Sequence, residues 1–158
     1  MDKFDVFKIE WEGLNEFHDM LDKMEKNAEN IIMEEMTKFG MLAEEGTKAL
    51  SPHDEGNGLE DSINFDKAKR EGSSIVVRGG SNSVYGLRRH EEPYRMGIHN
   101  KGLDRGFYVD GRGRGTRGKP TWRGYQPGRK YMENAIKAIE PDYNKMNDRA
   151  LKRILETD

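Results

Sequence analysis

The sequence predicts an α+β domain: a small antiparallel sheet packed by a long N-terminal helix and a C-terminal helix, with a long Gly/Arg-rich loop. Three observations carry this prediction. Apolar residues follow helical spacing from Gly13 to Leu50 and again after Tyr131. Apolar and polar residues alternate around Ile9 and Ile75. The order strand, long helix, strands, basic loop and helix indicates helices on one face of a sheet.

The strand that opens the chain is predicted from Phe7, Ile9 and Trp11, which alternate with charged residues. Gly13 ends this strand, and the long helix follows. At the far end of the helix, residues 51–58 contain Pro52 and two glycines, which cannot continue a helix. We therefore expect a loop over residues 51–58.

The long helix is predicted to have one apolar stripe and one acidic face. The stripe consists of Leu14, Phe17, Leu21, Met24, Ala28, Ile31, Ile32, Met36, Phe39, Ala43 and Leu50. The acidic face carries Glu16, Asp19, Asp22, Glu25, Glu29, Glu34, Glu35, Glu44 and Glu45. This face is either solvated or a docking surface for a basic partner.

The sheet is predicted to continue after the loop. Ile63 and Phe65 alternate with polar residues, and residues 74–78 follow a Glu-Gly pair, so the two runs form an antiparallel hairpin. We expect residues 79–83 to turn the chain and Val84 and Tyr85 to begin a further strand.

The last third is predicted to be helical again from Tyr131, after a glycine- and arginine-rich loop over residues 96–129. The short apolar run Phe107-Tyr108-Val109 in that loop could form half of a protruding hairpin. At Pro141 the helix either kinks or gives way to a new helix with proline in its first turn.

Composition limits the class of protein. The chain has 158 residues, of which 34% are hydrophobic and 35% charged, which fits one domain over residues 1–158 with a thin core. It contains no cysteine, which excludes disulfides and thiol catalysis. No apolar run approaches the ~20 residues of a membrane span, and the N-terminus does not read as a signal peptide. We expect a chain made in the cytoplasm, without membrane contact.

Charge is distributed unevenly along the chain. Residues 1–66 contain 6 Lys/Arg and 18 Asp/Glu, a net charge of -12, whereas residues 88–130 contain 12 and 4, a net charge of +8. Opposite charges attract within a molecule or between copies of it. Head-to-tail association is therefore one hypothesis.

The sequence gives no positive support for an enzyme, a metal site or a cofactor. Residues 113–120 resemble a phosphate-binding loop, but Pro120 replaces the hydroxyl residue that follows the lysine in such loops. His90, Glu91, Glu92 and His99 lack the spacing of known zinc motifs and are more simply surface residues beside a turn. No serine lies in a nucleophile elbow.

The strongest functional signal is the run of cations in the glycine-rich loop. Its candidate contact residues are Arg112, Arg114, Arg117, Lys119 and Arg123, interleaved with glycine and near the aromatic residues Tyr108, Trp122 and Tyr125. Arginines can neutralise phosphates, and aromatic rings can stack on bases. The alternative is that these cations pair with the acidic helix of a neighbouring subunit.

Several short motifs recur in the same order as in a known family. That family has an Ala-Pro, Asp, Thr-Gly, Leu, Ser-Ile signature between its long helix and its hairpin. Residues 49–52 and 58–63 look like this signature, and they also follow a strand and a long helix. Tyr85-Gly86, His90-Glu91 and residues 126–132, which run into Ala135, look like later Tyr, Glu and Arg-Pro-Phe-Leu-Ala blocks. The chain thus resembles the head-tail joining or tail-completion proteins of tailed bacteriophages and prophages.

The resemblance implies a structural virion protein of the phage neck, synthesised in the host cytoplasm. Such a protein would form a homo-oligomeric ring between a head-side connector or stopper protein and a tail terminator or tail tube protein. It would need no catalysis and no cofactor. The link at residues 53–57 is longer than in the family, and residues 96–124 look like a basic loop insertion that could contact packaged DNA. The alternative from another class is a nucleic-acid-binding module that acts through the Gly/Arg-rich loop.

Overall fold

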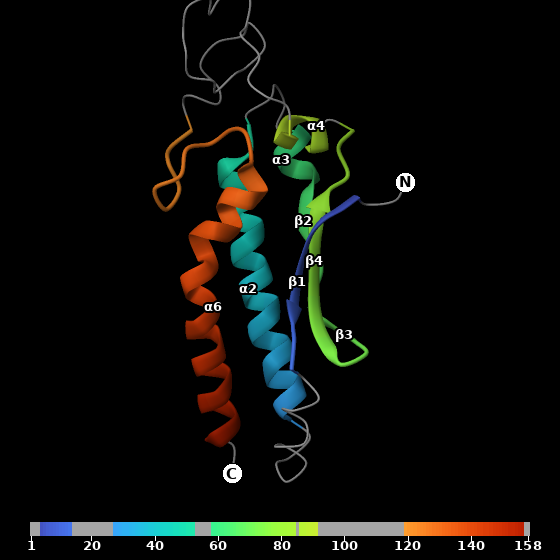
Figure 1. Ribbon diagram of the computed structural model, residues 1–158, viewed down its shortest axis with the longest axis vertical. Coiled ribbons are helices and arrows are strands. Elements are labelled where there is room, and N and C mark those ends of the chain that lie inside the picture. Colours follow the sequence, from blue (N-terminus) through green and yellow to red (C-terminus); the bar gives the residue numbers. More distant parts are fainter. Residues whose placement is uncertain (1–3, 14–26, 53–57, 85, 92–118, 157–158) are drawn as a thin grey trace, which may run out of the picture.

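The fold is α+β, as predicted. A computed structural model describes residues 4–13, 27–52, 58–84, 86–91 and 119–156. In these residues a four-stranded antiparallel sheet packs against helix α2 (Ala28–Leu50), and helix α6 (Tyr131–Leu155) packs against α2. Figure 1 shows the three layers in the order sheet, α2, α6. The long helix is therefore the element that contacts both of the others.

The sheet is built around strand β4 (Ser74–Ser81). Strand β1 (Phe4–Trp11) pairs with one side of β4, whereas β2 (Ile63–Phe65) and β3 (Lys69–Glu71) pair with the other side. All three pairings are antiparallel. This confirms the predicted opening strand and the predicted antiparallel hairpin.

The alternation predicted for β1 is visible at its centre. Ile9 lies opposite Val77 of β4, and both side chains are buried beneath α2. Lys8 and Glu10 point to the other face, where Glu10 accepts a hydrogen bond from Ser74. The face toward α2 is apolar, whereas the other face carries Lys8 and Glu10 together with the buried Val76, which lies opposite Glu10.

Helix α2 supplies the centre of the core. Its N-terminal extension, predicted from Gly13, falls on residues 14–26, which lie outside the described residues. Its end at Leu50 is confirmed: Ser51 is extended (φ -62°, ψ 145°) and Pro52 follows. The largest core cluster joins α2 to the sheet and α6 through Ile32, Met36, Phe39, Ala43, Ile75, Val77, Ile139, Met146, Ala150 and Ile154.

Helix α6 runs without interruption through Pro141. The alternative in which a new helix begins at Pro141 is therefore wrong. Proline removes one backbone donor from the helix interior. Ile139 before it and Met146 after it are both fully buried in the same core. Packing against α2 on both sides of the proline accounts for the continuous helix.

The turn predicted at residues 79–83 and the strand predicted after it are corrected. Residues 79–81 continue β4 instead of turning the chain, because a Cβ at Gly79 would lie 2.3 Å from the Phe65 ring, so glycine lets β2 approach. A further strand was expected to begin at Val84 and Tyr85, but Val84 lies in a turn and helix α4 (Gly86–Glu91) follows; Tyr85 lies outside the described residues. In the loop predicted over residues 51–58, Ser51 and Pro52 are not helical, as expected, and helix α3 (Gly58–Ser62) begins at its last residue; residues 53–57 lie outside the described residues.

Candidate interaction surface at the base of the basic segment

Residues 92–118, called here the basic segment, contain six Lys/Arg and three Asp/Glu. They lie outside the described residues, and so do three of the five predicted site residues, Arg112, Arg114 and Arg117. The chain on both sides of the segment is described: α4 precedes it, and residues 119–130, called here the strap, follow it. The contacts of α4 and the strap fix where the segment begins and ends.

Lys119, a predicted contact residue, lies in the strap and caps helix α2. Its Nζ donates hydrogen bonds to the backbone carbonyls of Lys48 (2.7 Å) and Ser51 (2.9 Å), and its side chain is only 16% exposed. The last carbonyls of a helix have no partner within the helix, and an ammonium group there also complements the helix dipole. Lys119 therefore stabilises the fold.

Arg123, the other described contact residue, is also held by the chain itself. Its guanidinium forms an ion pair with Asp142 of α6, and its central carbon lies 5.0 Å from the centre of the Trp122 ring. Arg123 and Gly124 both have positive φ (48° and 85°), as a tight two-residue turn between Trp122 and Tyr125 requires. This turn fastens the strap to α6.

The strap also packs directly on α2. A Cβ at Gly46 would lie 2.5 Å from the Trp122 ring, so only a glycine there allows this contact. Further along, the Gly128 amide donates to the Leu50 carbonyl at 2.8 Å. The strap thus contacts α2 through backbone, aromatic and charged groups.

Helix α4, on the other side of the basic segment, is bound to the start of α6. The Lys130 amide donates to the His90 carbonyl at 3.1 Å, and Lys130 Nζ lies 2.7 Å from a Glu91 carboxylate oxygen. The Tyr131 hydroxyl donates to the Gly86 carbonyl at 2.9 Å, and burial raises the pKa of this hydroxyl. The two described segments that flank the basic segment, α4 and the strap, therefore both contact the region where α2 ends and α6 begins, called here the base of the basic segment (Figure 1).

His90 is buried at this base, and both of its ring nitrogens lie near a polar partner. Its Nδ1 lies 2.7 Å from Glu91, and its Nε2 is 3.5 Å from the Glu133 amide in the first turn of α6. Hydrogen bonds from Lys130 and His90 lower the pKa of the Glu91 carboxyl. Glu92 and His99, the other members of the possible metal cluster, lie outside the described residues. Within the described part of the chain, no three His, Asp or Glu side chains gather in a way that could hold a metal ion.

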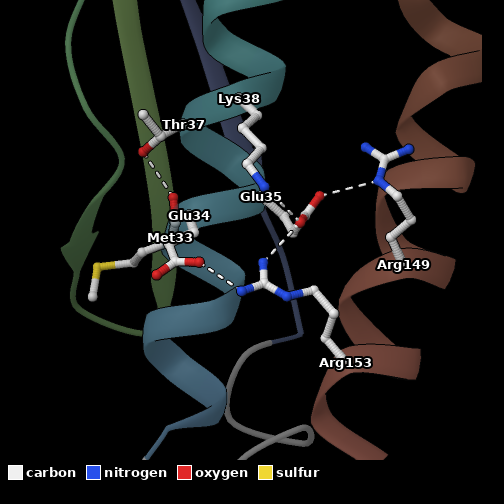
Figure 2. A network of polar contacts seen from close by, with 7 residues as sticks. All are labelled: Met33, Glu34, Glu35, Thr37, Lys38, Arg149 and Arg153. Carbon is white, nitrogen blue, oxygen red and sulfur yellow. Dashed lines mark hydrogen bonds and ion pairs between the residues drawn. The ribbon is translucent and has the colours of Figure 1, made fainter. Parts of the chain in front are cut away.

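The acidic face predicted for the long helix is partly buried in a contact with α6. Glu35 is only 3% exposed, and it accepts hydrogen bonds from Arg153 (2.8 Å), Arg149 (3.2 Å) and Lys38 (3.3 Å). Figure 2 shows Arg149 and Arg153 reaching from α6 toward this carboxylate. Burial alone would raise the pKa of Glu35, but the hydrogen bonds from Arg153, Lys38 and Arg149 outweigh it, and the pKa is lowered.

Other acidic residues of α2 are also engaged within the chain. Glu34 pairs with Arg153 at 2.7 Å, and Glu29 pairs with Arg70 of β3 at 3.1 Å. Glu44 accepts a hydrogen bond from the Phe65 amide at 2.9 Å. Arg153 lies on α6 and Arg70 on β3. Spacing along one helix could not reveal these partners, because they are 21 to 119 residues away in the sequence.

Comparison with protein-family models, with curated proteins and with solved structures gave no match. Among the described residues, no helix combines the length and apolar character needed to cross a membrane.

Proposed function

We propose that this chain is a structural protein of the bacteriophage neck, which completes the tail and joins it to the DNA-filled head as a ring. The observation that best supports this proposal is the base of the basic segment. Lys119 and Glu91 lie on either side of the segment. Lys119 is bonded to the end of α2, and Glu91 is bonded to Lys130 at the start of α6. Both are thus joined to the body of the domain, which consists of the sheet, α2 and α6. These contacts join both flanks of the segment to the sheet and helices of the domain, which would carry the segment toward a partner in the ring.

The positions of the family-like motifs agree with this proposal. Residues 49–52 end α2, residues 58–63 run from α3 into β2, and residues 126–132 join the strap to α6. Each motif thus occupies a junction between elements, where proline, glycine and capping residues have a local structural reason to occur. The order of these junctions is the order of the motifs in the resemblance.

The proposed mechanism is binding without catalysis. Arg112, Arg114 and Arg117 would neutralise phosphates of packaged DNA in the lumen of the ring. The body would contact its own copies, a head-side connector or stopper protein and a tail terminator or tail tube protein. Because a ring repeats each contact, many weak contacts would add up to firm attachment. The virion would be the place of action.

Deletion of the gene in the phage or prophage that carries it tests this proposal. Lysates would be examined by negative-stain electron microscopy after induction. We expect filled heads beside unattached tails, or tails of abnormal length, and a plasmid copy of the intact gene should restore joined particles. Fully joined particles in the deletion lysate would contradict the neck function.

A nucleic-acid-binding module is the second candidate, and one observation favours it. The charge of -12 over residues 1–66 argues against approach to DNA, but Glu29, Glu34 and Glu35 are neutralised by arginines of the same chain. Repulsion of a phosphate backbone is correspondingly weaker. Steep salt dependence of DNA binding by the isolated protein would support this candidate, and weak binding at low salt would reject it.

A further inference from the structure

One face of α2 is covered neither by the sheet nor by α6. It is a shallow hollow of about 660 Å³ lined by Lys38, Met41, Leu42, Glu44, Glu45 and Lys48. At its centre Met41 is 65% exposed, whereas an average methionine is largely buried. Lys38 and Glu45 are also exposed, on either side of Met41. This face, called here the Met41 face, has an apolar centre and charged ends.

The charges of the Met41 face are arranged so that the face complements itself. Lys38 lies as far before the Met41–Leu42 peptide bond as Glu45 lies after it, about 5 Å along the helix axis in each direction. A second α2 running antiparallel across this point would place its Glu45 on Lys38 and its Lys38 on Glu45. Met41 of each copy would then meet Leu42 of the other. Such a match requires a two-fold axis.

We propose that the Met41 face binds a second copy of this chain through a two-fold, antiparallel α2 contact. The contact contains two exposed methionine side chains and two reciprocal Lys38–Glu45 ion pairs. Because its apolar area is small, the dimer is weak and forms at high protein concentration. A two-fold contact differs from the head-to-tail contact of a closed ring, so the dimer describes the free protein before assembly and does not depend on the proposed neck function.

Charge reversal tests the proposal, with the dimer dissociation constant measured by sedimentation velocity on the full chain. Lys38→Glu places Glu opposite Glu45 at two places in the dimer, and Glu45→Lys places Lys opposite Lys38 at two places. Because Lys38 also donates to the buried Glu35 of its own chain, Lys38→Glu should lower the melting temperature, and all dissociation constants are measured well below that temperature. Each variant alone should raise the dissociation constant about tenfold or more. An equimolar mixture of the two variants pairs opposite charges at both places, so it should associate as the unmodified protein does.

The mixture distinguishes a two-fold contact from any other. In a head-to-tail contact, the partner of Lys38 would be another surface, and mixing would restore nothing. The matched control is the pair Lys137→Glu and Glu133→Lys, which exchanges charges of an exposed ion pair on α6 and should leave the dissociation constant unchanged. Circular dichroism melts of every variant would show that each one folds.

A cysteine provides a second measurement, because the chain contains none. Met41→Cys should form an intermolecular disulfide under mild oxidation, since residue 41 lies next to the proposed axis. Leu151→Cys, at an exposed apolar position of α6, should cross-link much more slowly. The proposal is overturned if the unmodified protein stays monomeric at all concentrations. It is also overturned if the mixed variants fail to associate, or if the two cysteines cross-link at equal rates.

Discussion

The two halves of α2 are held in place by different kinds of contact. In the first half, the buried carboxylate of Glu35 joins α2 to α6 through Arg149 and Arg153. At the C-terminal end, Lys119 and Trp122 of the strap fasten residues that follow the basic segment. The first contact pairs two helices of the fold, and the second closes the base of the segment. Loss of the first should therefore weaken the whole domain, and loss of the second should act locally.

The largest effect is expected from removing both arginines around Glu35. Arg149→Met with Arg153→Met leaves a buried carboxylate with Lys38 alone, which should lower the free energy of unfolding by about 3 kcal/mol. Chemical denaturation would measure it. Adding Glu35→Leu should recover much of the loss, since no buried charge remains. Lys145→Met with Lys152→Met, at exposed positions of α6, is the control and should change little.

A smaller effect is expected where the strap packs on α2. Gly46→Ala places a Cβ 2.5 Å from the Trp122 ring, so the ring must move. The gain in helix propensity offsets part of this cost, and the net loss should be about 1–2 kcal/mol. Combining Gly46→Ala with Trp122→Leu should give less than the sum of the single losses. Additive losses would show that the contact between Gly46 and Trp122 does not restrict this position.

Loss of the helix cap should be smaller still and confined to one end. Lys119→Met removes the donor to the Lys48 and Ser51 carbonyls, which should cost about 1 kcal/mol because water can replace it in part. Hydrogen exchange should speed up in the last turn of α2 and stay unchanged near Glu35. Lys137→Met is the control. Faster exchange throughout α2 would contradict a local role for the cap.

The contribution of Glu35 to the free energy of unfolding should change with pH only in acid. Its pKa in the folded protein lies below the ordinary value of 4.5, so its stabilising effect is complete above that pH. The effect is lost as pH falls through the folded pKa. Glu35→Gln should therefore be less stable than the parent at pH 7, and the difference should shrink below pH 4.5. Thermal melts between pH 3 and pH 7 would measure it, and a constant difference would rule out an ionised Glu35.

The sequence could predict the elements whose signals are local. Alternation around Ile9, the stop at Pro52 and the apolar spacing after Tyr131 each depend on near neighbours, and each prediction is confirmed in the described residues. The turn expected at Gly79 was wrong because glycine there serves packing against Phe65. Local spacing cannot distinguish a glycine that turns the chain from one that admits a ring.

The candidate site could be predicted only in part. The sequence predicted Lys119 and Arg123 as contact residues for DNA or a neighbouring subunit, and it could not show that they bond within the chain to the end of α2 and to Asp142 of α6. Those contacts arise when distant segments pack together. The other three predicted contact residues, Arg112, Arg114 and Arg117, lie outside the described residues, and the proposed contact with DNA stays a prediction for them.

The most direct test of this account is the DNA content of particles that carry Arg112→Gln, Arg114→Gln and Arg117→Gln together. The control carries Lys137→Gln, Lys145→Gln and Lys152→Gln on α6. Micrographs would give the fraction of full heads among joined particles. We predict joined particles with fewer full heads for the arginine variant and normal ones for the control. Equal DNA retention, or failure to join at all, would contradict a lumenal role for these arginines.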